Sequence, residues 1–171
     1  FFNVANHFSQ LAKKSRTNGS SEKIAKEQTG KPSLDIYKLG DDVLRQNSKR
    51  ITKVDESIRK LAREMLQSMY AAKGIGLAAP QIGINKELLV IDVNFEDSAA
   101  EPLILINPEI TDFGTTLNSY EEGCLSIPGV YLNVVRPSTI KLKFRDEMGR
   151  PRKMKADGLL ARCIQHEMDH L

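Results

Sequence analysis

Two of the three histidines stand four residues apart at the end of the chain, in the sequence CIQHEMDHL. On an α-helix, residues at this spacing lie one above the other at about 6 Å, so His166 and His170 can direct imidazole nitrogens at one cation. Glu167 would lie beside that cation without binding it, where a carboxylate can act as a general base on an activated water. The pattern predicts a catalytic metal site. The competing interpretation is the polar face of a solvated helix.

A catalytic metal site of this type needs a third protein ligand. Cys163 shares the helix face, but about 10 Å of helix axis separates it from His170, so we expect it to line the wall of the pocket. Cys124 lies in EEGCLSIPG, where glycine and proline bend the backbone and can present a thiol from a non-helical segment. A thiolate with two imidazoles suits Zn²⁺ or Fe²⁺. The alternative is that Cys124 is a small buried apolar side chain.

The sequence GIGLAAPQIG matches the dinucleotide-binding fingerprint only formally, at Gly74, Gly76 and Ala79. That fingerprint requires a strand before the glycines and a helix after them, whereas here a predicted helix precedes them and Pro80 follows. We instead expect a backbone that runs close to a ligand, because glycine has no side chain to block the approach. Gln81 would then offer an amide N–H to a carbonyl oxygen that gains negative charge. A tight turn leaving a helix explains the loop equally well.

The elements that must position these groups follow from hydrophobic spacing. Apolar residues between 55 and 72 recur at helical intervals, with Asp55 as the N-cap and Gly74 as the stop, and helical spacing returns from Asp157 to the last residue. The sequence DEMGRP predicts a turn. Apolar or alternating segments predict mostly antiparallel strands at 88–93, 103–106 and 140–144. Helices segregated around short strands indicate an α+β fold.

Composition limits the class of protein. A chain of 171 residues that is 40% hydrophobic and 27% charged fits one globular domain. No segment approaches the roughly 20 apolar residues that span a bilayer, and the net charge of +3 is spread without a basic stripe for DNA. Two cysteines without a signal peptide indicate a reducing compartment. Residues 1–33 are predicted to be a flexible extension, or alternatively the remnant of an organelle transit peptide.

Three segments in this order, GIGLAAPQ at 74–81, EGCLS at 122–126 and QHEMDH at 165–170, resemble the motifs of the peptide deformylases. The stretch IPGVYLNVVRP, with Tyr131 where many bacterial members have arginine, is similar to the type 1B-like members of cyanobacteria and plastids. The resemblance implies an α+β deformylase fold, in which short, mostly antiparallel sheets pack around a central C-terminal HExxH helix. It also implies a metal-dependent deformylase domain at 34–171, which we expect to be truncated at its C-terminal end because family members continue past HEMDHL.

The activity implied by the resemblance is that of a metallohydrolase. It removes the N-formyl group from the N-terminal formylmethionine of newly synthesised polypeptides and releases formate. The cofactor in the family is Fe²⁺, often replaced by Zn²⁺ or Ni²⁺ in the prepared protein. The implied metal ligands are Cys124, His166 and His170.

The resemblance also assigns roles to other residues. Glu167 would be the acid/base residue, and the side chain of Gln81 and the backbone N–H of Leu125 would form the oxyanion hole. A structural ion pair would join Glu122 to Arg136. The implied substrate-binding residues are Ile75, Gly76, Ile127, Gly129, Val130, Tyr131, Leu159 and Cys163.

The implied partners are N-formylmethionyl nascent peptides and, transiently, the ribosome, with neither DNA nor a membrane. The protein is expected to be a monomer or a weak dimer in a bacterial cytoplasm, with a plastid stroma as the alternative location. Two other functional classes stay open. A zinc endopeptidase usually takes its third ligand from residues after the HExxH motif, and this sequence offers none there. A non-catalytic peptide-binding or ribosome-associated scaffold predicts no stoichiometric metal.

Overall fold

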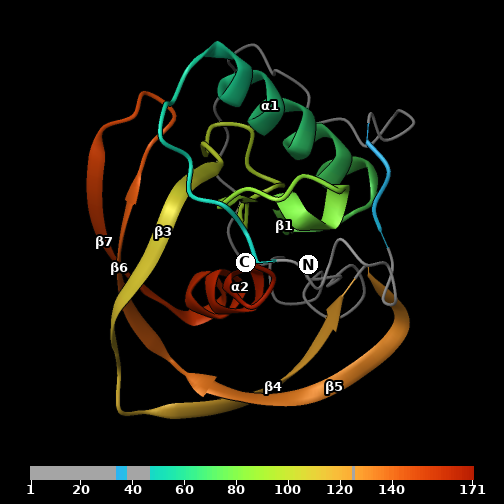
Figure 1. The fold of residues 1–171 in the computed structure, drawn as a ribbon. Helices are drawn as coiled ribbons and strands as arrows, with labels where there is room; N and C mark the ends of the chain where they lie inside the picture. The colour runs from blue at the N-terminus through green and yellow to red at the C-terminus, as the bar shows by residue number, and fades with distance from the viewer. Residues whose placement is uncertain (1–33, 38–46, 125) are drawn as a thin grey trace.

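The computed structural model describes residues 34–37, 47–124 and 126–171, so the predicted extension at 1–33 lies outside the described residues. Within the described part, a five-stranded sheet has the order β1-β2-β3-β6-β7, and β4 pairs with β5 in a second sheet (Figure 1). All pairs between these strands are antiparallel, which confirms the α+β prediction. The elements are α1 (Glu56–Ala71), β1 (Gly76–Ala78), the 3₁₀-helix η3 (Ala79–Ile82), β2 (Leu88–Ile91), β3 (Leu103–Phe113), β4 (Leu117–Cys124), β5 (Ile127–Pro137), β6 (Thr139–Arg145), β7 (Pro151–Asp157) and α2 (Gly158–Met168).

The two helices cover opposite faces of the sheet around β1 and β2 (Figure 1). In β2, Leu88 and Val90 pack in the apolar cluster that contains the buried face of α1. Leu89 and Ile91 pack in the cluster that contains the buried face of α2. A strand covered on both faces is apolar at every position, which explains the continuous run in ELLVIDV. No helix in the described part of the chain is long and apolar enough to cross a membrane.

Helix α1 begins where the sequence predicts. The Asp55 carboxylate accepts hydrogen bonds from the backbone N–H groups of Ser57 (3.1 Å) and Ile58 (3.3 Å), as an N-cap does. The end of the helix differs from the prediction. The helix stops at Ala71, and Lys73 rather than Gly74 adopts the left-handed backbone conformation, with φ of 59°. A hydrogen bond from the Gly74 N–H to the Met69 carbonyl (2.9 Å) closes this end of the helix. The positive φ belongs to Lys73, so Gly74 does not supply the left-handed conformation here.

The strand predictions hold where side chains alternate. In β6, Ile140 and Leu142 are buried while Lys141 and Lys143 are exposed, and the predicted DEMGRP turn follows. Two predicted boundaries are wrong: β2 ends at Ile91, and β3 continues to Phe113 because its second half is an exposed continuation of the pairing with β6. The sequence pattern did not predict the remaining strands, β1, β4, β5 and β7.

The β4–β5 sheet lies across α2 on the side away from β1 (Figure 1). Its strands pair over nearly their full lengths, from Leu117 opposite Pro137 to Gly123 opposite Tyr131. Beyond that pair the register shifts, and Cys124 at the end of β4 faces Ile127. Cys124 therefore lies at the end of β4, from which its thiol can reach the helix that carries His166.

A buried asparagine anchors the segment before α1. Asn107 accepts a hydrogen bond from the Ile51 N–H (2.8 Å) and donates one to the Ile51 carbonyl (2.7 Å). Its φ is 50°, a conformation that asparagine tolerates better than alanine does. Asn107→Ala is expected to lower the free energy of unfolding by about 3 kcal/mol, because two buried backbone groups lose their partner and the backbone is strained.

Urea unfolding followed by circular dichroism measures this loss. The control is Asn133→Ala, which removes the same group from an exposed position of β5 and is expected to change stability by less than about 0.5 kcal/mol. Equal losses in the two variants would contradict the anchoring role.

Candidate metal centre

The three predicted ligands come together from two parts of the fold. Cys124 ends β4, His166 lies in α2, and His170 lies in the turn that follows the end of α2 at Met168. The prediction that His170 is inside the helix is therefore wrong by two residues. The backbone nevertheless stays helical through Asp169 (φ −63°, ψ −22°), so the two imidazole rings remain neighbours, edge to face, with centroids 5.4 Å apart and an interplanar angle of 69°.

The spacing of the donor atoms fits a metal ion. One ligand atom from each of Cys124, His166 and His170 lies within 4.8 Å of the other two. The Cys124 Sγ and the His170 Nε2 are 3.6 Å apart. Ligands at 2.0–2.3 Å in tetrahedral positions are separated by about 3.3–3.8 Å, so these side chains need little movement to share one ion. A thiolate and two imidazoles are also the donor types that Zn²⁺ and Fe²⁺ bind.

Electrostatics favours the thiolate form of Cys124. Burial by itself raises the pKa of this thiol, but hydrogen bonds with His166 and His170 outweigh burial and lower the pKa to about 5. The other thiol behaves differently. Cys163 is fully buried, and burial together with the nearby Glu167 carboxylate raises its pKa well above the ordinary value. Only Cys124 of the two is prepared to bind a cation at neutral pH.

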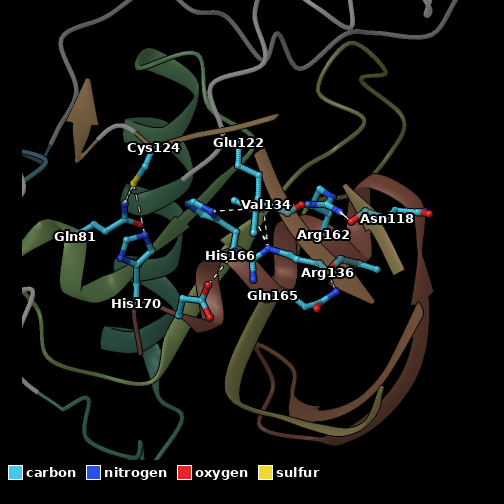
Figure 2. A network of polar contacts seen from close by, with 12 residues as sticks. Gln81, Asn118, Glu122, Cys124, Val134, Arg136, Arg162, Gln165, His166 and His170 are labelled. Carbon is cyan, nitrogen blue, oxygen red and sulfur yellow. Dashed lines mark hydrogen bonds and ion pairs between the residues drawn. The ribbon is translucent and has the colours of Figure 1, made fainter. Parts of the chain in front are cut away.

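A buried carboxylate orients one of the imidazoles. Glu122 Oε1 lies 3.2 Å from His166 Nδ1, so an Nδ1–H that donates to it leaves Nε2 as the ligand atom. Arg136 Nε donates to both oxygens of Glu122, at 3.0 and 2.8 Å, and Arg162 donates to Oε2 at 3.1 Å (Figure 2). Burial raises the pKa of Glu122, but the hydrogen bonds and charges of His166 and Arg136 lower it to about 2. The predicted ion pair between Glu122 and Arg136 is thus one part of a larger network.

Glu167 is fully buried against the glycine loop. A Cβ atom added to Gly76 would lie 2.9 Å from Glu167 Oε1 and 2.8 Å from Cys163 Sγ. Any side chain at this position would therefore displace the carboxylate or the thiol. The absence of a Cβ at Gly76 lets β1 pass directly over Glu167 and Cys163, while the predicted approach of this loop to a ligand stays a prediction.

Gln81 presents its amide nitrogen to the centre. Its Oε1 accepts a hydrogen bond from the Ala78 N–H (3.0 Å), which orients the amide. Its Nε2 then lies 3.3 Å from Ser126 Oγ and 3.8 Å from Cys124 Sγ (Figure 2). Ser126, which is 1% exposed, is the last residue of the EGCLS segment, but the sequence analysis assigned no role to it.

Similarity to known proteins agrees with this geometry. The match to the polypeptide deformylase family covers residues 33–171. The chain belongs to this family. It is 97% identical over 168 residues to a peptide deformylase of Prochlorococcus marinus strain AS9601, a match that covers 98% of this chain and 84% of that protein.

Solved structures of deformylases have the same fold. A peptide deformylase from Synechococcus elongatus in complex with actinonin is 56% identical, with a TM-score of 0.84 over 89% of this chain and 83% of that one. The plant peptide deformylase PDF1B is 39% identical, with a TM-score of 0.78 over 83% of this chain and 77% of that one. The protein is a metallohydrolase that removes the N-formyl group from nascent peptides, with a metal site made by Cys124, His166 and His170.

The substrate-binding residues expected of a deformylase fall into two groups. Ile75, Leu159 and Cys163 lie together in the apolar cluster that contains the buried face of α2, with Cys163 Sγ 3.8 Å from the Ile75 carbonyl. Gly129, Val130 and Tyr131 lie on β5, where Gly129 has φ of 77° and both Val130 and Tyr131 are about half exposed. The described part of Ile127 is its backbone in β5, and Leu125 lies outside the described residues.

The thiolate form of Cys124 gives a prediction for the metal-free deformylase. Its pKa falls from the ordinary 9.0 to about 5, so the folded protein binds fewer protons at this sulfur than the unfolded chain does between those pH values. The ultraviolet absorbance of one thiolate is expected to persist at neutral pH and to disappear as the pH falls through about 5. Cys124→Ser provides the baseline, since the Cys163 thiol stays protonated. A midpoint near 9 would contradict the prediction.

Proposed function

We propose that Cys124, His166 and His170 hold the divalent cation of this deformylase and that Glu167 is its acid/base residue. The observation that carries the proposal is the convergence of three ligand atoms within 4.8 Å of one another beside the buried Glu167. Such a cation supplies Lewis acidity to the formyl carbonyl and lowers the pKa of water. The residues around it must position the formyl group and move the proton.

Glu167 has the position and chemistry for the proton transfers. Its carboxylate can accept the proton of the attacking water and return it to the departing amine, so that formate and a free amino terminus leave. Its burial under Gly76 keeps bulk water from competing for that proton. The carboxylate does not need to bind the metal for this role.

We assign the oxyanion hole to the Gln81 amide and the backbone N–H of Leu125. The fixed amide of Gln81, oriented by its bond to Ala78, supports the first assignment. A donor held in place before the reaction stabilises the charge that develops on the carbonyl oxygen, by roughly 3 kcal/mol for each donor in comparable sites.

The substrate peptide is proposed to lie along β5. The exposed segment from Gly129 to Tyr131 would pair with the peptide backbone, as an added strand does. The methionine side chain would enter the apolar region formed by Ile75, Ile127, Leu159, Cys163 and His166. The apolar surroundings of Ile75 and Cys163 support a pocket for an uncharged side chain.

The metal is proposed to be Fe²⁺ in the cell, with Zn²⁺ or Ni²⁺ in the prepared protein, because one thiolate and two imidazoles bind all three ions. The deformylase domain is proposed to span 34–171. We place the protein in a bacterial cytoplasm, as a monomer or weak dimer that meets N-formylmethionyl peptides at the ribosome. The cyanobacterial relatives favour this location over a plastid stroma.

Formate release from a formyl-Met peptide, measured under anaerobic conditions with metal analysis on the same sample, tests the proposal. One iron per chain and turnover that stops with a chelator are the expected results. A folded, iron-loaded protein that leaves formyl peptides intact, or that cleaves internal peptide bonds instead, would contradict it.

A further inference from the structure

The metal centre is assembled from two separate elements that meet through polar contacts. Cys124 belongs to the β4–β5 sheet, whereas the two histidines follow one another along α2 and its end. Side chains of α2 reach across to that sheet, as when Gln165 Nε2 donates to the Pro137 carbonyl at 2.9 Å (Figure 2). The distance between the thiolate and the imidazoles therefore depends on how firmly the helix is attached to the sheet.

Arg162 is the buried cation at this junction, and the residues proposed for the metal and the substrate do not include it. It is 6% exposed. One guanidinium nitrogen donates to the Val134 carbonyl (2.9 Å) and to Glu122 Oε2 (3.1 Å), and the other donates to the Asn118 carbonyl (2.7 Å). The Tyr120 ring lies over the guanidinium, 5.0 Å from ring centroid to Cζ.

These partners lie on both strands of the sheet. Asn118, Tyr120 and Glu122 are on β4, and Val134 is on β5. A planar guanidinium with its donors in a fixed fork can bond to several acceptors in set directions, which a lysine ammonium at the same place cannot reproduce. Arg162 thus attaches α2 to β4 and β5 at once.

Arg136, the other arginine on Glu122, has a different place in the network. It lies on β5, so its bonds to Glu122 join the two strands of one sheet. It reaches the end of α2 through Asp169, whose side chain is 66% exposed. An exposed ion pair contributes little. Arg162 is therefore a buried attachment between the helix and the sheet that bonds to both strands, in addition to the single bonds of Gln165 to Pro137 and of His166 to Glu122.

We propose that Arg162 is a positioning residue of the metal centre, because its guanidinium sets the distance between Cys124 and the imidazoles. This inference rests on the proposed metal ligation. It predicts that replacing Arg162 changes the geometry and affinity of the site, beyond any change in overall stability. Arg162 also holds Glu122 against His166 Nδ1, so the orientation of the His166 ring depends on Arg162 as well.

Cobalt-substituted protein reports on the site without turnover. In Arg162→Met, which keeps an unbranched apolar stem but removes the guanidinium, the affinity for Co²⁺ is expected to fall by about 10–100-fold, as for other residues that orient metal ligands. The thiolate-to-cobalt absorption band is expected to shift or weaken, and kcat is expected to fall with little change of KM. Arg162→Lys should recover part of the affinity and of the band, because the charge beside Glu122 remains.

The matched control is Arg152→Met, which removes an arginine of the far strand β7 that is 57% exposed and pairs with Asp146 in the turn before that strand. It is expected to keep the cobalt spectrum and affinity of the original protein. If Arg162→Met does not fold, Arg162→Lys decides the question by the same measurements. A folded variant with a lowered melting temperature but an unchanged cobalt spectrum and affinity would overturn the proposal. If the cobalt-substituted original protein showed no thiolate-to-cobalt band, the assignment of Cys124 as a ligand would instead be refuted.

Discussion

Glu167→Gln is expected to lower kcat for deformylation by about 10²–10⁴-fold while the protein keeps its metal, because an amide cannot accept and return the proton of the attacking water. Glutamine has nearly the same shape as glutamate, so the packing under Gly76 is retained. The metal content is expected to stay at one ion per chain, since the ligand atoms belong to Cys124, His166 and His170.

Formate release and metal analysis on the same preparation measure both quantities. Glu101→Gln makes the same chemical change at an exposed position between β2 and β3, and full activity is expected there. If Glu167→Gln lost its metal together with its activity, the carboxylate would have to be reassigned as a ligand. Activity close to that of the original protein would remove Glu167 from the proton transfer.

The sequence predicted the helices well because their packing is apolar and periodic. Helix α1 buries Ile58, Ala62, Met65, Leu66 and Met69 on one face, which is the spacing by which it was recognised. The strands β4 and β5 gave no such signal. The side chains of LNSYEEGC are mostly exposed, and IPGVYLNVVRP contains proline and glycine near its start. Because polar bonds attach the β4–β5 sheet to α2, its strands do not need the alternation of apolar and polar residues by which an amphipathic strand is recognised.

The site was predictable in part for a similar reason. The HExxH spacing indicated two ligands from local geometry alone, whereas Cys124 needed the flanking motif because it meets the histidines only in the folded chain. Arg162 could not be recognised, since its partners Asn118 and Glu122 are 44 and 40 residues away and an arginine on a helix is usually solvated. Long-range polar contacts of this kind leave no periodic trace in a sequence.

Glu122→Gln is expected to lower the free energy of unfolding of the metal-free protein by about 3–5 kcal/mol, the usual cost of removing one partner from a buried ion pair. The Glu122 side chain is 2% exposed, and those of Arg136 and Arg162 are 13% and 7% exposed, so solvent cannot replace the lost charge. Glu121→Gln is the matched control. It changes the neighbouring residue of β4, which is exposed, and a change of less than about 0.5 kcal/mol is expected.

The dependence on pH separates the charge of Glu122 from its packing. Folding lowers its pKa from the ordinary 4.5 to about 2, so the unfolded chain binds the proton first as the medium becomes acidic. The stabilisation from the ionised carboxylate is complete above pH 4.5 and is lost as the pH falls toward 2. In urea unfolding with a chelator present, the difference between Glu122→Gln and the original protein should therefore be constant near neutral pH and shrink in acid. A difference that does not change between pH 7 and pH 3 would mean that packing, and not the hydrogen bonds and charges of His166 and Arg136, accounts for the loss.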